Sequence, residues 1–149
     1  RSLYTYWQRT APSPVMMALD SSKKDICMVK RERTDSAAQS LVLLNGPQFV
    51  EAARATAEKL IQKHGVDNGE ALSTDAFRML TSRKPTVKEA GILNRLLSEQ
   101  IEVYQDQNQS HAFLGVGQVK TQTKNPSYTA AVTSLVSTLM NFDESTSKR

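Results

Sequence analysis

The sequence predicts a mainly all-α domain, a bundle of four to five helices with an irregular N-terminal segment that can hold a short pair of strands. Two stretches have the sequence of a capping box, Ser36-Ala37-Ala38-Gln39 and Thr86-Val87-Lys88-Glu89, in which two side chains satisfy free backbone donors at a helix start. Four segments also carry apolar residues at helical spacing. The length of 149 residues suits one domain. We expect an irregular wrap over 1–35, a helical core over 36–144 and a frayed tail over 145–149.

The N-terminal 35 residues show no helical periodicity. Leu3-Tyr4-Thr5-Tyr6-Trp7 and Ile26-Cys27-Met28-Val29 are rich in aromatic or branched residues, which favour strands, and the two could pair. Between them lies Ala11-Pro12-Ser13-Pro14, whose prolines push the preceding residues into extended backbone.

The first two helices follow directly. The first begins at Ser36 and ends at Asn45-Gly46. We expect Asn45 also to cap the second helix, with Pro47 in its first turn. Gly65 should end that helix, with Lys63 and His64 near its negative end. Its expected buried face consists of Phe49, Ala52, Ala53, Leu60 and Ile61.

Three further segments complete the predicted core. A helix over 70–81 should bury Leu72, Ala76, Phe77 and Leu80. Another opens at Thr86 and should bury Ala90, Leu93, Leu97, Ile101 and Tyr104. The polar stretch 105–125 is expected to be mostly loop. The last helix starts at Asn125-Pro126, ends near Asn141 and has the strongest apolar face, formed by Tyr128, Ala131, Val132, Leu135, Val136, Leu139 and Met140.

Composition and motifs disfavour several classes of function. The net charge of +4 is spread along the chain, unlike the concentrated basic stripe of a nucleic-acid binder. No apolar run reaches the roughly 18 residues of a membrane helix. His64 and His111 lie far apart and near no ligand cluster, so no metal site is expected. Cys27 is alone, which excludes a disulfide within the chain.

A set of charged and aromatic residues offers candidate sites. Arg31 and Arg33 could hold an anionic ligand. We instead favour ion pairs with Asp20 or Asp143 that fix the irregular segment on the bundle. In the alternative, Asp20, Arg31, Arg33 and Asp143 converge as part of an active site.

The aromatic residues near the N-terminus offer a different candidate. Tyr4, Tyr6 and Trp7 could stack on a carbohydrate ligand, although packing is the expected role of such side chains. Whether the chain is an enzyme stays open.

Several motifs together resemble one known family. They are Arg1-Ser2-Leu3-Tyr4-Thr5-Tyr6-Trp7, Arg9-Thr10-Ala11-Pro12, Arg31-x-Arg33-Thr34, the run from Gln39 to Arg54, and the closing Met140-Asn141-Phe142-Asp143-Glu144. The sequence resembles the C-terminal domain of unknown function in large multidomain proteins of planctomycetes and related bacteria. Those proteins typically carry a planctomycete-type cytochrome c domain and a second uncharacterised domain before it.

The resemblance implies a role and a location, but no catalytic residue. It implies a helical C-terminal module that packs on other domains of a longer polypeptide, which is exported to the periplasm or the extracellular space. It places a c-type haem elsewhere in that polypeptide and no cofactor in this chain. The sequence departs from the family at Thr34-Asp35-Ser36-Ala37, where a proline is usual, and at Ser21-Ser22, where Ala-Pro is usual.

Overall fold

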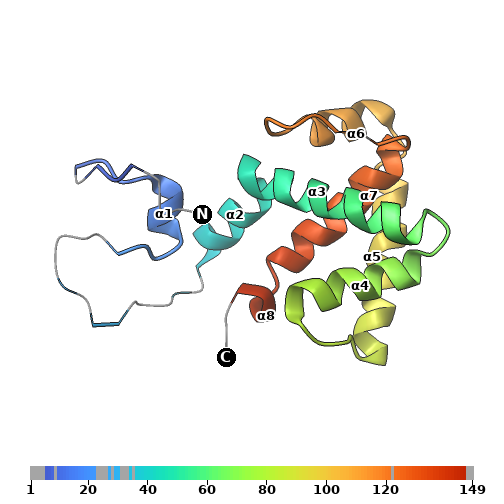
Figure 1. Cartoon of the computed structure of the whole chain (residues 1–149), viewed down its shortest axis with the longest axis horizontal. Coiled ribbons are helices and arrows are strands. Elements are labelled where there is room, and N and C mark those ends of the chain that lie inside the picture. Colours follow the sequence, from blue (N-terminus) through green and yellow to red (C-terminus); the bar gives the residue numbers. More distant parts are fainter. Residues whose placement is uncertain are drawn as a thin grey trace. The chain divides into compact units, whose positions relative to one another are not determined.

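The computed structural model describes residues 6–8, 10–22, 27, 29–30, 34, 36–121 and 123–146. Within these ranges the chain forms helices joined by irregular connections, which confirms the predicted fold class (Figure 1). The helices are α1 (Pro14–Ala18), α2 (Ala37–Asn45), α3 (Pro47–His64), α4 (Gly69–Thr81), α5 (Val87–Val103), α6 (Gln107–Leu114), α7 (Pro126–Met140) and α8 (Asp143–Thr146).

The expected strand pair falls partly on these ranges. Tyr6, Trp7, Cys27 and Val29 are described, and none of them lies in a strand. Residues 3–5, 26 and 28 lie outside the described residues. The chain divides into two compact units, Arg1–Val42 and Leu43–Arg149.

Helix α1 was not predicted, and it ends in a well-defined turn. Pro14 stands in its first turn, where the missing N–H costs nothing. At its end the Asp20 N–H donates to the Met17 carbonyl at 3.2 Å and the Ser21 N–H to the Met16 carbonyl at 2.9 Å. With Asp20 at φ +53°, this is a Schellman motif. Asp tolerates this left-handed conformation better than most residues, so the chain turns sharply here.

Both predicted capping boxes form. The Gln39 N–H donates to Ser36 Oγ at 3.3 Å, and Gln39 Oε1 accepts the Ser36 N–H at 3.4 Å. At the start of α5, Glu89 accepts the Thr86 N–H at 2.7 Å and its own N–H reaches Thr86 Oγ1 at 3.4 Å. These reciprocal bonds fix where α2 and α5 begin.

The junction of α2 and α3 differs from the prediction in one respect. Asn45 is the last residue of α2, and Gly46 takes the N-cap position of α3 without a side-chain bond. The helix ends at Asn45 as predicted, but Asn45 still belongs to α2 and therefore does not cap α3. Lys63 and His64 occupy the last turn of α3 as predicted, and Gly65 follows at φ +77°.

The segment 105–125 contains a helix where mostly loop was expected. Helix α6 begins after Asp106, whose carboxylate accepts the Asn108 N–H at 2.9 Å. Its Ser110 and Leu114 are buried. The single turn of α8 also lies in the described C-terminal part, so Ser145 and Thr146 are helical where a frayed tail was expected. Residues 147–149 lie outside the described residues.

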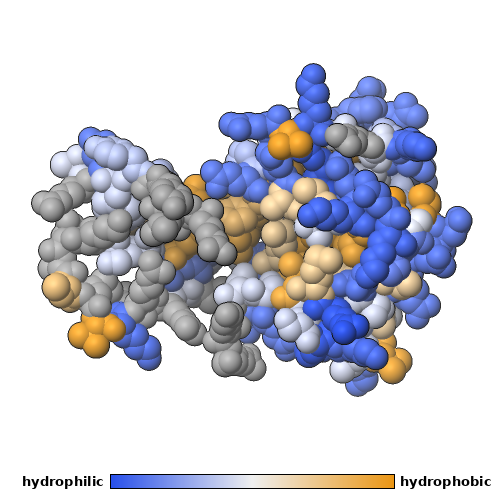
Figure 2. Space-filling view, in the orientation of Figure 1, coloured by the Kyte–Doolittle hydropathy of each residue, from blue (hydrophilic) through white to orange (hydrophobic). Residues whose placement is uncertain are grey.

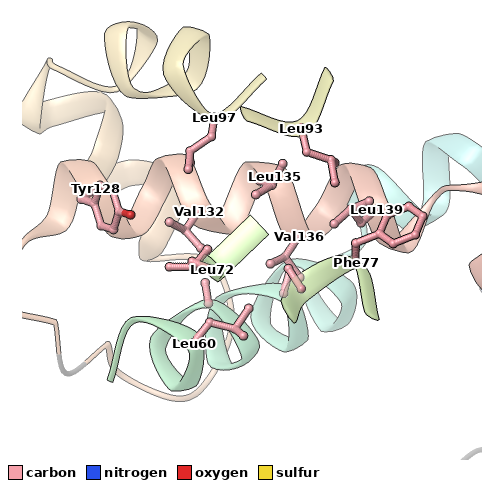
Figure 3. Packing of buried hydrophobic residues seen from close by; sticks show 13 residues of the cluster. Leu60, Leu72, Phe77, Leu93, Leu97, Tyr128, Val132, Leu135, Val136 and Leu139 are labelled. Atoms are coloured by element: carbon pink, nitrogen blue, oxygen red, sulfur yellow. The ribbon is translucent and has the colours of Figure 1, made fainter. Parts of the chain in front are cut away.

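Helix α7 forms the centre of the second unit. It packs against α3, α4, α5, α6 and α8. In Figure 3, Leu93 and Leu97 of α5 lie on one side of α7, and Leu60 of α3 and Leu72 of α4 on the other. Leu135 is fully buried and Leu139 is 5% exposed, which confirms the predicted face. Burial of this cluster drives the assembly of the unit.

Two expected core positions face outward instead. Ala52 on α3 and Ile101 on α5 are exposed. The buried stripe of each helix is narrower than its apolar pattern, because α7 covers only one side of α3 and of α5.

A buried arginine joins α3 to the connection after α6. Arg54 is 3% exposed, and its guanidinium donates to the carbonyls of Leu114, Val116 and Val119. One turn earlier, Glu51 accepts the Gln118 N–H at 2.8 Å. Five donors in a planar fork allow one Arg to satisfy several carbonyls at once. The pair therefore fixes the 114–119 connection on α3.

Candidate functional site

Asp20 anchors the start of α2 within the first unit. Its carboxylate accepts the Thr34 N–H, the Thr34 hydroxyl and Gln39 Nε2, each at 2.8 Å. Gln39 Nε2 also reaches Thr34 Oγ1 at 3.1 Å. We call Asp20, Thr34, Ser36 and Gln39 the clasp. It joins the turn after α1 to the capping box of α2, so two segments nearly twenty residues apart are held together.

The hydrogen bonds of the clasp favour the charged form of the Asp20 carboxylate. Hydrogen bonds from the Thr34 backbone, then from its hydroxyl and from Gln39, lower the pKa of Asp20. These bonds stabilise the charged form of the carboxyl group. A carboxylate with a lowered pKa is a weak proton donor and acceptor near neutral pH. The arrangement therefore suits Asp20 to positioning α2 better than to acid–base chemistry.

Helix α2 consists mainly of apolar residues, with Gln39, Ser40 and Asn45 as its polar members, and yet none of its residues is buried. Its centre is the run Leu41-Val42-Leu43-Leu44. Leu41 is 62% exposed and Leu44 is 40% exposed, and a spacing of three places them side by side on the helix. Val42 and Leu43 are half-buried. We call Leu41 and Leu44 the α2 surface.

The visible face of the second unit is mostly hydrophilic. Figure 2 shows hydrophilic residues, in blue, over much of the part of the view where Figure 1 draws α3 to α7. Orange and pale orange are visible where Figure 1 draws α2. Within the described residues, a leucine-rich helix with no buried residue is therefore a candidate surface for a partner.

The predicted site residues fall in different places. Tyr4, Arg31 and Arg33 lie outside the described residues, so their predicted contacts are untested. Tyr6 is 83% exposed and Trp7 is half-buried. Asp20 belongs to the clasp in the first unit, while Asp143 is exposed at the start of α8 in the second. The structure leaves the convergence of Asp20 and Asp143 a prediction.

Sequence reasoning missed three polar residues that organise the structure. Thr34 and Gln39 were noted for their place in motifs, but not as partners of Asp20. Arg54 closed the longest motif without any role. The sequence did contain an indication that Arg54 is buried. Arg54 follows Ala53 on a helix face whose other residues are apolar.

The described residues offer two further findings. No helix among them combines the length and the apolar character needed to cross a membrane. A search of the same residues for three or more His, Cys, Asp or Glu side chains grouped like metal ligands finds none.

Comparison with known proteins gives one match. The model of a family described as "PSD1: Protein of unknown function (DUF1553)" matches residues 1–97. That range includes the whole clasp, the α2 surface and Arg54. Neither a curated protein nor a solved structure matches the chain.

Proposed function

The chain belongs to the PSD1 family of proteins of unknown function (DUF1553), and from this premise we propose that it is a docking module that packs on other domains of a longer polypeptide through α2. The single observation behind the proposal is the exposure of this helix. A helix with leucine and valine on several sides is normally buried, whereas no residue of α2 is buried in the described structure.

The energetics favour a partner for the α2 surface. Covering a leucine side chain is worth about 1.5–3 kcal/mol relative to full exposure. Since Leu41 is 62% and Leu44 is 40% exposed, covering both would contribute about 1.5–3 kcal/mol. A contribution of this size changes a dissociation constant by more than tenfold, so the loss of both leucines should be measurable.

The clasp supports the same role. Three hydrogen bonds on Asp20 and a capping box fix the first turn of α2 before any partner arrives. A surface held in its bound conformation loses less entropy on docking. In this proposal Asp20 is a positioning residue for the interface.

We place the longer polypeptide outside the cytoplasm and assign it a c-type haem in another domain. Both assignments come from the resemblance of the N-terminal and closing motifs. This chain has a single cysteine, Cys27, and no C-x-x-C-H sequence, so a haem of that type would have to be attached elsewhere.

The test uses the remainder of the parent polypeptide, produced separately and mixed with this chain. We expect a stable complex that the double variant Leu41→Ser/Leu44→Ser weakens at least tenfold. The matched control is Val87→Ser/Ile92→Ser, because these α5 residues are also exposed, at 93% and 66%. Absence of a complex, or equal loss in both double variants, would refute docking through α2. Circular dichroism of each variant alone verifies its fold.

The alternative is a carbohydrate-binding or active site around Tyr4, Tyr6 and Trp7, with Asp20, Arg31, Arg33 and Asp143. The 83% exposure of Tyr6 favours it, because an exposed ring can stack on a sugar. A glycan array with the intact chain and with Tyr6→Ala tests it. Binding that the substitution abolishes would support this role, and no binding to any glycan would remove it.

A further inference from the structure

A groove follows the outer face of α4 in the second unit. Its volume is about 590 Å³, which is within the range of ligand-binding pockets. Its lining includes Ala71 and Thr74, two small side chains one turn apart on α4. Asn68 lines it at the start of α4, Lys84 lines it beyond the end of the helix, and His64 lines it beside Asp75. The groove therefore runs lengthwise along the helix.

Acidic residues lie at one end of the groove and basic residues at the other. Asp67 and Glu70 lie at the start of α4, whereas Arg78 is in its last turn and Lys84 follows its end. Eight residues separate Glu70 from Arg78, which corresponds to about 12 Å along a helix. One end of the groove is thus anionic and the other cationic.

The charged side chains at both ends are exposed to solvent. Across the described part of the second unit, other charged groups form ion pairs, such as Arg83 with Glu89 and Glu144. Asp67, Glu70, Arg78 and Lys84 take part in none of the ion pairs of the described residues.

The middle of the groove is already neutralised. Asp75 accepts Lys63 Nζ and His64 Nε2, both at 2.8 Å. Its carboxylate is engaged by these two groups, so the free charges are confined to the two ends.

We propose that this groove binds an extended peptide segment that carries a cationic and an anionic side chain about 12 Å apart. The cation would meet Asp67 and Glu70, and the anion would meet Arg78 and Lys84. A single amino acid is too short to reach both ends. An extended chain advances about 3.3–3.6 Å per residue, so a spacing of four residues fits. This inference is independent of the docking proposed for α2.

The experiment follows amide signals of the ¹⁵N-labelled chain by NMR while a peptide is added. The probe is acetyl-Lys-Ser-Gly-Ser-Glu-amide. Its control has the same composition with adjacent charges, acetyl-Ser-Lys-Glu-Gly-Ser-amide. We expect shifts at Asn68, Thr74 and Lys84 at millimolar peptide, with at least threefold tighter binding of the first peptide. Added salt should weaken binding, because exposed charges are screened.

Variants at each end of the groove test the assignment of the charges. Glu70→Gln and Arg78→Gln remove one exposed charge each and should weaken binding about two- to fivefold, as expected for one exposed ion pair. Lys88→Gln on α5 is the matched control and should leave binding unchanged. The amide spectrum itself reports whether each variant is folded.

Three outcomes would overturn the proposal. They are equal affinity for the two peptides, shifts located away from the groove, and binding unaffected by both end variants. Inorganic phosphate that shifts Arg78 and Lys84 as strongly as the peptide would also overturn it, because the site would then select a simple anion.

Discussion

Replacing Arg54 by methionine should destabilise the second unit by about 3 kcal/mol. The substitution keeps an apolar stem of similar length and removes the three bonds to Leu114, Val116 and Val119. Leu114 is buried, so its carbonyl has little access to water once the guanidinium is gone. Losing a bond from a charged donor to this acceptor costs about 1.5–3 kcal/mol.

The other two acceptors contribute less. Val116 is half-buried and Val119 is exposed, so water can replace the guanidinium at both. Each lost bond then costs roughly 0.5 kcal/mol, the low end for a net hydrogen bond. The sum for the three bonds is roughly 2.5–4 kcal/mol, in the range of mutations that break a buried network.

Urea unfolding measures this loss, with the free energy obtained by linear extrapolation. Arg54→Lys keeps the charge but loses the planar fork, so we expect about half the effect of Arg54→Met. Lys59→Met on the exposed side of α3 is the control and should stay within about 0.5 kcal/mol of the wild type. The Gln118 amide should exchange its hydrogen faster in Arg54→Met than in the wild type, and should be unchanged in the Lys59→Met control. A loss below about 0.5 kcal/mol for Arg54→Met would refute the reasoning.

Four further predictions follow from the same packing and electrostatics. Leu135→Ala, at a fully buried site, should cost about 2–5 kcal/mol in urea unfolding. Gly91→Ala meets no atom within 4 Å and should raise the melting temperature, since Ala in a helix is worth about 0.5–1 kcal/mol over Gly. Gly117→Ala should lower it, because Gly117 has φ +107° and the new Cβ would lie 2.3 Å from a carboxylate oxygen. Hydrogen bonds from Arg83, and next from the Thr86 backbone and hydroxyl, lower the pKa of Glu89 from 4.5 to about 2, so the folded chain binds fewer protons than the unfolded chain in that interval. The contribution of ionised Glu89 to the free energy of unfolding is therefore complete above pH 4.5 and is lost as the pH falls toward 2. Unfolding experiments at decreasing pH should not show this loss in Glu89→Gln.

Local rules predicted the parts of the fold that depend on neighbours in sequence. The capping box at Thr86 and the stop at Gly65 involve residues within one turn, so the sequence alone identifies them. Helix α6 was missed because only Ser110 and Leu114 face the core, too few for a visible apolar stripe. Asp106 is nevertheless a typical N-cap residue, and it marks the start of α6 in the sequence.

Contacts between distant residues escaped prediction for a physical reason. Asp20 meets Thr34 fourteen residues away and Arg54 meets Leu114 sixty residues away, and such pairs depend on the course of the whole chain. Exposure of α2 was equally hidden, because an apolar helix in a sequence predicts burial without saying which chain covers it. The sequence thus indicated the types of residue in the candidate site, but not which other residues they contact.

The central place of α7 has a consequence for how the protein is made. On a ribosome, α3, α4 and α5 emerge first, and the helix that covers their apolar faces is completed only at Met140. Translation proceeds at about 5–20 residues per second, so the 37 residues between Val103 and Met140 leave these faces uncovered for roughly two to seven seconds. The family match ends at residue 97, inside α5. A nascent chain that has reached residue 97 contains the whole matched range and lacks α7, whose apolar side chains complete the core.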